Sequence, residues 1–274
     1  MIKDLNMDNS VTVITLTRKR PELLIRAINS VKRQDYPEII EHMIIIDDCL
    51  TTKKILQGMT GKGNIVWHYT SRKDGEYKDP SHIAGLRNYS VINAKSKWIS
   101  FLDDDNEFEP HHISSLIACA QKTGCRAVHS YMKIYLRDGV PYLEQKMPWC
   151  RDPEEAKKIY ADLCDKGVLR IGSNIVRDRA DSLDHPDPAR TVDTGEWLLD
   201  RSLLLEFKFP TEYDEKDWQN ITTEDDKLMK TLIENRVSIA CTKLPTLRYY
   251  LGGYSNNLTP KAEAVDQNKI WIID

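Results

Sequence analysis

Apolar and polar positions along the first half of the chain predict strands and helices in turn. Short runs rich in strand-forming residues occupy positions 11–17, 43–47, 64–69 and 98–102. Residues 21–34, between the first two runs, place apolar side chains at helical spacing, and residues 81–95 do the same before the fourth run. This alternation is typical of an α/β protein, in which helices flank a parallel sheet.

The second half follows a less regular pattern. Helices are predicted for residues 111–121, 152–166 and 224–235. Strands are predicted for residues 127–136, 140–145 and 237–242, the first two joined by a turn at 137–139. Asp152 is suited to cap the start of its helix, while Gly124 and Gly167 are suited to end the helices before them.

Three adjacent acids, Asp103, Asp104 and Asp105, follow the fourth predicted strand. Adjacent carboxylates repel one another, and a bound cation would offset that repulsion. Mg²⁺ needs only one or two protein carboxylates when substrate phosphates complete its coordination. The alternative is a solvated acidic turn. In open α/β sheets ligands gather at the carboxyl ends of the strands, where Thr17, Asp48 and Asp105 would all project.

Residues 101–106, Phe-Leu-Asp-Asp-Asp-Asn, resemble the Asp-any-Asp motif of family 2 glycosyltransferases. Further segments resemble that family in the same order: 11–17 its first strand, 21–34 its first helix, 44–48 its second strand, 85–88 an arginine-bearing helix start and 223–225 its acidic pair. The resemblance spans residues 11–236. It implies a GT-A fold, with a Rossmann-like, mostly parallel central sheet flanked by helices and a smaller acceptor-side subsheet. Residues 1–110 would bind the nucleotide sugar, and residues 111–274 would be the acceptor-binding half of the same domain.

The resemblance also implies roles for residues that bind the nucleotide. Asp48 would read the uracil imide, although Asp47 or Asp48 could instead cap a helix starting near residue 52. Asp104 would contact the ribose, with Asp103 as the alternative if the motif is aligned one residue earlier. Arg87 would pair with a phosphate or orient the acidic cluster. Thr17 or Arg18 would line the nucleotide cleft.

For the chemical step, Asp105 is the predicted ligand of Mn²⁺ or Mg²⁺, and Asp225 the predicted general base. Threonines before Asp225 equally predict a helix N-cap with acids in the first turn, and both can hold. His111 and His112 are more typical of a helix start than of metal ligands, and no histidine follows His185 to complete a metal sphere. The resemblance implies inversion at the anomeric carbon.

Aromatic residues suggest where sugars would bind. Trp197 and Trp149 are candidates for stacking on a sugar, although the leucines after Trp197 favour a core position. Residues 248–255, with three tyrosines and two glycines, predict either a lid over the diphosphate or an edge strand.

Composition restricts the possible binding partners and the expected location. The 274 residues carry a net charge of −3, so no basic excess indicates nucleic acid. No apolar run approaches the ~20 residues that span a bilayer, and the first residues lack the core of a signal peptide, so a cytoplasmic location is expected, with peripheral membrane association open. Six cysteines without a Cys-x-x-Cys pair are expected to be reduced thiols.

Together these features predict a metal-dependent, inverting hexosyl- or N-acetylhexosaminyltransferase that uses a UDP-sugar. The acceptor stays open: a glycan, a lipid-linked glycan or a small molecule. Two alternatives are a sugar-phosphate nucleotidyltransferase and a sugar-nucleotide-binding protein without activity. The absence of glycine from residues 16–20 weighs against the first, and the presence of both Asp105 and Asp225 weighs against the second.

Overall fold

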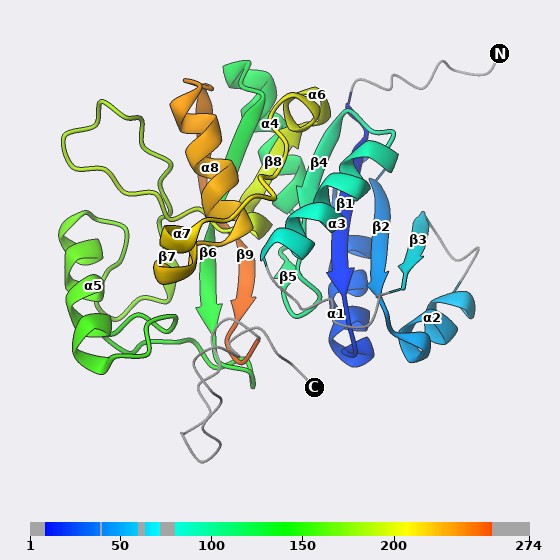
Figure 1. Ribbon diagram of the computed structural model, residues 1–274, viewed down its shortest axis with the longest axis horizontal. Helices are drawn as coiled ribbons and strands as arrows, with labels where there is room; N and C mark the ends of the chain where they lie inside the picture. The colour runs from blue at the N-terminus through cyan, green and yellow to red at the C-terminus, as the bar shows by residue number, and fades with distance from the viewer. Residues whose placement is uncertain (1–8, 39, 60–63, 72–79, 254–274) are drawn as a thin grey trace.

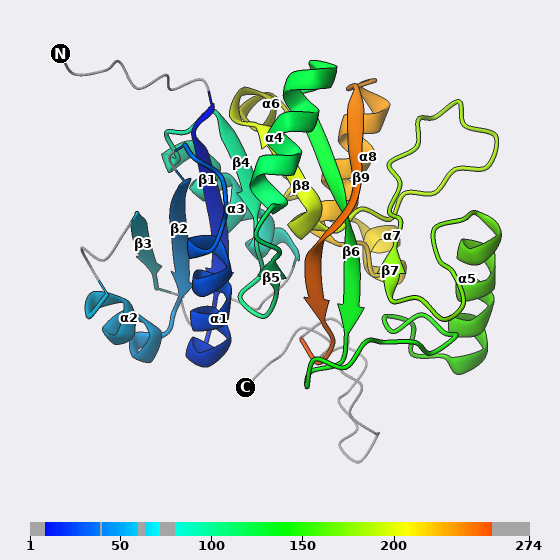
Figure 2. The same ribbon diagram turned by 180° about the vertical axis from the view of Figure 1, so that it is seen from behind.

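A curved sheet of nine strands runs through the molecule (Figures 1 and 2). The computed structural model describes residues 9–38, 40–59, 64–71 and 80–253. The strand order is β3-β2-β1-β4-β8-β6-β9-β5, and β7 pairs with β6. The strands are β1 (Val11–Thr17), β2 (Ile40–Asp47), β3 (Ile65–Thr70), β4 (Trp98–Phe101), β5 (Glu107–Phe108), β6 (Ala127–Tyr135), β7 (Ile175–Val176), β8 (Trp197–Asp200) and β9 (Ile239–Tyr250).

The first four strands form the parallel half of the sheet, with β1 between β2 and β4. Helices α1 (Pro21–Lys32), α2 (Leu50–Gln57) and α3 (Pro80–Asn93) connect them. The predicted α/β order of this half is therefore confirmed. Because the strands are parallel, the carboxyl ends of β1, β2 and β4 meet at one edge of the sheet, where ligands bind in such folds.

Alternating side chains of the strands fill a core on each face of the sheet. Val11 and Val13 of β1 pack with α1 and with α4 (His112–Thr123). Ile14 of β1 faces the other way, toward α3, α6 (Arg201–Glu206) and α8 (Glu224–Glu234), which Figure 1 shows in front of the sheet. The two-residue period of a strand thus gives β1 two buried faces.

The second half of the chain adds antiparallel strands to the same sheet. Strand β8 is antiparallel to both β4 and β6 and so joins the two halves. Helix α5 (Pro153–Asp165) lies at the far side of the molecule, and Asp152 caps it as predicted by accepting bonds from the N–H groups of Glu154 and Glu155. The short helix α7 (Glu215–Gln219) precedes α8.

Two predictions for the second half are wrong. Residues 140–145 form no strand, only a bridge from Pro141 to Tyr135, because β7 and β9 already occupy the outer part of β6. The last strand is not confined to 237–242 but runs to Tyr250, since it pairs along β6 and with β5. Of the two alternatives for residues 248–255, lid or strand, residues 248–250 adopt the strand, and 254–255 lie outside the described residues.

No helix in the described segments is long and apolar enough to span a bilayer. All six cysteines fall within those segments, and each is a free thiol, as expected from their spacing. The thiols are therefore not structural cross-links.

Candidate functional site

Asp104, in the middle of the acidic triplet, is a buried structural acid. It follows β4 and has no exposed surface. Thr17 Oγ1 donates a hydrogen bond of 2.7 Å to Asp104 Oδ2, and Arg20 Nη2 lies 2.5 Å from Asp104 Oδ1. Thr17 and Asp104, both predicted nucleotide contacts, therefore bind each other beneath the site. Of the two ribose candidates, Asp103 is the one with a reachable side chain, 37% exposed.

Asp105 projects from the same turn and is held from three sides. Arg20 Nη1 lies 2.6 Å from Asp105 Oδ2, and Arg26 of α1 donates to the Asp105 backbone carbonyl. Gly253, which follows β9, lies against the carboxylate: a Cβ on this glycine would come within 2.6 Å of Asp105 Oδ2. The close approach explains why a residue without a side chain occupies this position.

Arg87 connects the triplet to the predicted base. This α3 residue is 5% exposed, its Nε donates to Glu224 Oε1 at 3.0 Å, and its Nη2 lies 3.5 Å from Asp103 Oδ1. Its guanidinium also packs over the rings of Phe101 and Phe209. This geometry favours the second predicted role of Arg87, orienting the acids, over direct pairing with a phosphate.

Asp225 stands in the first turn of α8. Thr223 caps the helix by accepting a bond from the Asp226 N–H, and Asp226 completes a capping box. The Thr223 hydroxyl also donates to Asp225. The predicted threonine cap is therefore confirmed, and it fixes the Asp225 carboxylate beside Arg87 and Asp103, which are near enough for electrostatic interaction.

Negative charge accumulates where these elements meet. Burial, with repulsion from Asp105 and Asp225, raises the pKa of Asp103 despite the nearby Arg87. Burial, followed by repulsion from Asp103 and Asp225, raises the pKa of Asp193 well above its usual value. A divalent cation would neutralise such a crowd of partly buried carboxylates, and the donors are all oxygens, the atoms that Mg²⁺ and Mn²⁺ prefer.

A cation bound by these acids would need further ligands from a bound substrate. Within the described segments, no three histidine, cysteine or acidic side chains converge into a metal cage. One or two carboxylates are enough when a diphosphate supplies the other oxygens, so Asp105 with Asp103 fits a metal that arrives with a nucleotide.

Asp48 lies at the end of β2, at the same edge of the sheet. Its φ is +51°, a conformation that aspartate tolerates better than most residues, and Tyr69 donates a 3.1 Å hydrogen bond to its Oδ1. The N-cap of α2 is Cys49 and shows no side-chain cap bond, so the alternative of a capping aspartate is wrong. Asp48 is only partly buried and can contact a ligand.

The remaining candidates, one histidine and two tryptophans, differ in how deeply they are buried. His112 is fully buried and shares a 2.7 Å hydrogen bond with Thr246, which agrees with the helix-start interpretation. Trp197, 2% exposed, is a core residue, so sugar stacking by it is wrong. Trp149 is half-buried, and its Nε1 donates to the Tyr249 hydroxyl at 3.3 Å. Tyr249 is near enough to Asp105 and Asp193 for both to raise its pKa, after burial itself.

Sequence reasoning missed Arg20 and Arg26 as parts of the site. The signal was available for Arg20, which belongs to the basic run Arg18-Lys19-Arg20 directly after β1. Arg26 carried no local signal, because it is one of several charged residues on an amphipathic helix and meets Asp105 only through the fold.

Comparison with known proteins adds independent findings. A family model described as Glycosyl transferase family 2 matches residues 11–180. WcaA of Escherichia coli K12, which carries the name of a colanic acid biosynthesis glycosyl transferase, is 31% identical over 135 residues. That match covers 48% of this chain and 45% of WcaA, so the chain spans about half the length of this relative.

Solved structures of S. aureus TarS share the fold. TarS 1-349 superposes with a TM-score of 0.60 at 14% identity, covering 90% of this chain and 61% of that one. Its complex with UDP-GlcNAc superposes with a TM-score of 0.55 at 15% identity, covering 88% and 58%. The predicted fold class is thereby confirmed.

Proposed function

Because this chain belongs to glycosyl transferase family 2, we propose that it moves a sugar from a nucleotide diphosphate, a UDP-sugar, to an acceptor hydroxyl with inversion. One observation carries the proposal: the Arg87 guanidinium lies between Asp103 of the acidic triplet and Glu224, the neighbour of Asp225. It thereby joins the acids suited to a metal–diphosphate complex to the carboxylate suited to act as base.

Several features support a uridine nucleotide as the donor. Asp48, at the carboxyl end of β2, has an acceptor oxygen for the uracil imide, and Asp103 is exposed enough to accept from the ribose. Both follow strands of the parallel half, where nucleotides bind in such sheets. The related TarS fold has been solved with UDP-GlcNAc and with UDP.

The cation in this proposal is Mn²⁺ or Mg²⁺, held by Asp105 with Asp103 beside it. Such a metal acts as a Lewis acid that offsets the charge developing on a departing diphosphate. Arg20 and Arg26 hold the Asp105 side chain and backbone, so this ligand is already oriented. Preorganised ligands need little rearrangement during the reaction.

Asp225 serves as the general base. It accepts the proton of the acceptor hydroxyl as that oxygen bonds to the anomeric carbon, and the bond from that carbon to the phosphate oxygen breaks with its electron pair leaving on the diphosphate. Attack from the face opposite the leaving group inverts the configuration. The Thr223 cap keeps Asp225 in the first turn of α8, at the positive end of the helix dipole.

A thermal-shift screen of nucleotide sugars with and without Mn²⁺ tests the proposal, because a ligand that binds only the folded state raises the melting temperature. We expect a UDP-sugar with Mn²⁺ to give the largest shift. Asp105→Ala should remove the metal-dependent part, whereas Asp225→Asn should keep the shift and lose transfer.

Asp184→Asn is the matched control, because Asp184 is exposed and remote in sequence from Asp105 and Asp225. It should change neither the thermal shift nor the transfer rate. Binding of the donor by the parent protein without transfer to any acceptor or to water would favour a binding protein without activity. Unchanged turnover in Asp225→Asn would remove the base assignment.

A further inference from the structure

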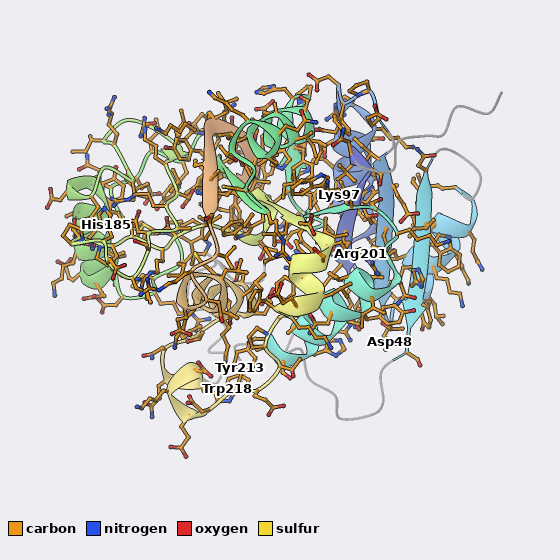
Figure 3. All side chains as sticks on the ribbon, turned by 90° about the horizontal axis from the view of Figure 1, so that it is seen from above. Asp48, Lys97, His185, Arg201, Tyr213 and Trp218 are labelled. Carbon is orange, nitrogen blue, oxygen red and sulfur yellow. The ribbon has the colours of Figure 1, made fainter. Side chains whose placement is uncertain are left out.

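An aromatic pair lies directly before the helix that carries the proposed base. Tyr213 precedes α7, and Trp218 lies within it (Figure 3). The two ring centroids are 5.6 Å apart with the planes tilted by 44°. Trp218 is 45% exposed, an unusual state for so large an apolar side chain, and its orientation is therefore not explained by the core.

The pair is held firmly. Lys227 of α8 places its Nζ 4.3 Å from the Tyr213 ring centroid and 2.6 Å from Asp217 Oδ2, next to Trp218 in the chain. Asp214 caps α7 with a reciprocal capping box. An exposed tryptophan fixed in this way loses little conformational freedom when a ligand covers it, which favours binding.

The same contacts fix the pair relative to Asp225. Lys227 is two residues beyond Asp225 in α8, and the Thr222 N–H donates to the Asp217 carbonyl at 2.9 Å. The Tyr213 hydroxyl finds no hydrogen-bond partner among the described residues, and its pKa is raised by burial and then by Glu224 and Asp225. Tyr213 thus lies within electrostatic range of the proposed base.

Charge restricts what this surface can bind. Residues 212–227 contain seven acidic side chains against two lysines, one of which is Lys227 on the Tyr213 ring. A phosphate or other anionic group would be repelled there, whereas the hydroxyl groups of a neutral sugar can donate hydrogen bonds to carboxylates. An exposed indole face within so acidic a segment suits the apolar C–H face of a pyranose ring.

We infer that Trp218, supported by Tyr213, is the platform on which a neutral pyranose of the acceptor stacks, with one hydroxyl turned toward Asp225. The inference rests on the proposed function and narrows it, because it makes the group that receives the sugar part of a glycan. Phosphate groups of an acceptor would have to lie away from α7.

Saturation-transfer NMR with methyl β-D-glucopyranoside and methyl β-D-N-acetylglucosaminide, in the presence of UDP and Mn²⁺, tests the platform. Sorbitol serves as an acyclic polyol with similar hydroxyl groups but no ring face. We expect at least one pyranoside to bind and sorbitol not to bind. Trp218→Ala should weaken pyranoside binding at least tenfold, while Trp218→Phe should stay within about threefold because an aromatic face remains.

Ile171→Ala, which removes another exposed apolar side chain, 65% exposed, is the matched control and should bind as the parent does. A retained UDP–Mn²⁺ thermal shift shows that each variant is folded. Equal pyranoside binding by Trp218→Ala, equal binding of sorbitol, or no pyranoside binding by the parent protein would overturn the inference. These outcomes leave the donor reaction measurable as hydrolysis of the UDP-sugar, whose absence counts instead against the proposed function.

Discussion

Replacing Arg87 by methionine is expected to destabilise the fold strongly. Methionine keeps an apolar stem against Phe101 and Phe209 but removes the charge that faces Glu224 at 3.0 Å. Both partners are buried, with 5% and 7% of their surface exposed. Removing one partner of a buried ion pair costs about 3–5 kcal/mol, a large part of the ~5–15 kcal/mol that stabilises a typical domain. The melting temperature should fall by roughly 6–20 °C.

The stability lost in Arg87→Met should depend on pH. Burial already raises the pKa of Glu224 to about 7, and the Arg87 charge opposes that rise. Without Arg87 the pKa of Glu224 should rise further, so the variant protein takes up a proton at neutral pH and avoids a buried unpaired charge. The destabilisation should therefore be smaller at pH 5 than at pH 8, because a raised carboxyl pKa costs stability only where the group ionises.

Urea unfolding followed by circular dichroism at both pH values measures the effect. Glu224→Gln in the Arg87→Met background is the matched test, since it removes the unpaired carboxylate and should recover part of the lost stability at pH 8. A cost below about 1 kcal/mol for Arg87→Met, the size of an exposed pair, would refute the reasoning. The reasoning would also be refuted if the double variant were no more stable than Arg87→Met at pH 8.

Three further predictions concern single positions. Asp178, two residues after β7, is buried, and burial raises its pKa to about 7. The folded state therefore holds a proton that the unfolded state releases, and stability should fall as pH rises from 4 to 7. In urea titrations Asp178→Asn should flatten this slope by about 1 kcal/mol per pH unit. Thr223→Ala removes the cap of α8 and should lower the free energy of unfolding, measured in urea, by about 1 kcal/mol. Asp225 also loses its hydrogen bond from Thr223, so the transfer rate should fall by a larger fraction than the free energy of unfolding does. Gly253→Ala places a Cβ within 2.6 Å of Asp105 Oδ2 and should weaken Mn²⁺ binding in calorimetry while the melting temperature stays nearly constant; unchanged affinity would contradict the assigned contact.

Elements whose signals are local could be predicted from the amino-acid sequence alone. The two-residue alternation of β1, the capping of α5 by Asp152 and the Thr223 cap of α8 each depend on neighbours within a few positions. The acids after β4 were predictable for the same reason, because a buried strand must end before three charged residues. These choices follow from backbone geometry and solvation, which a short segment already contains.

The burial and the partners of each acid depend on long-range contacts. Arg87 meets Glu224 across 137 positions, and Asp104 is buried because Thr17 and Arg20 reach it from the end of β1. Residues 140–145 lost their predicted strand because other strands already bonded to β6. Burial and the occupancy of a strand edge are properties of the whole assembly, so the same local pattern can be exposed or buried, paired or unpaired, depending on residues far away in the chain.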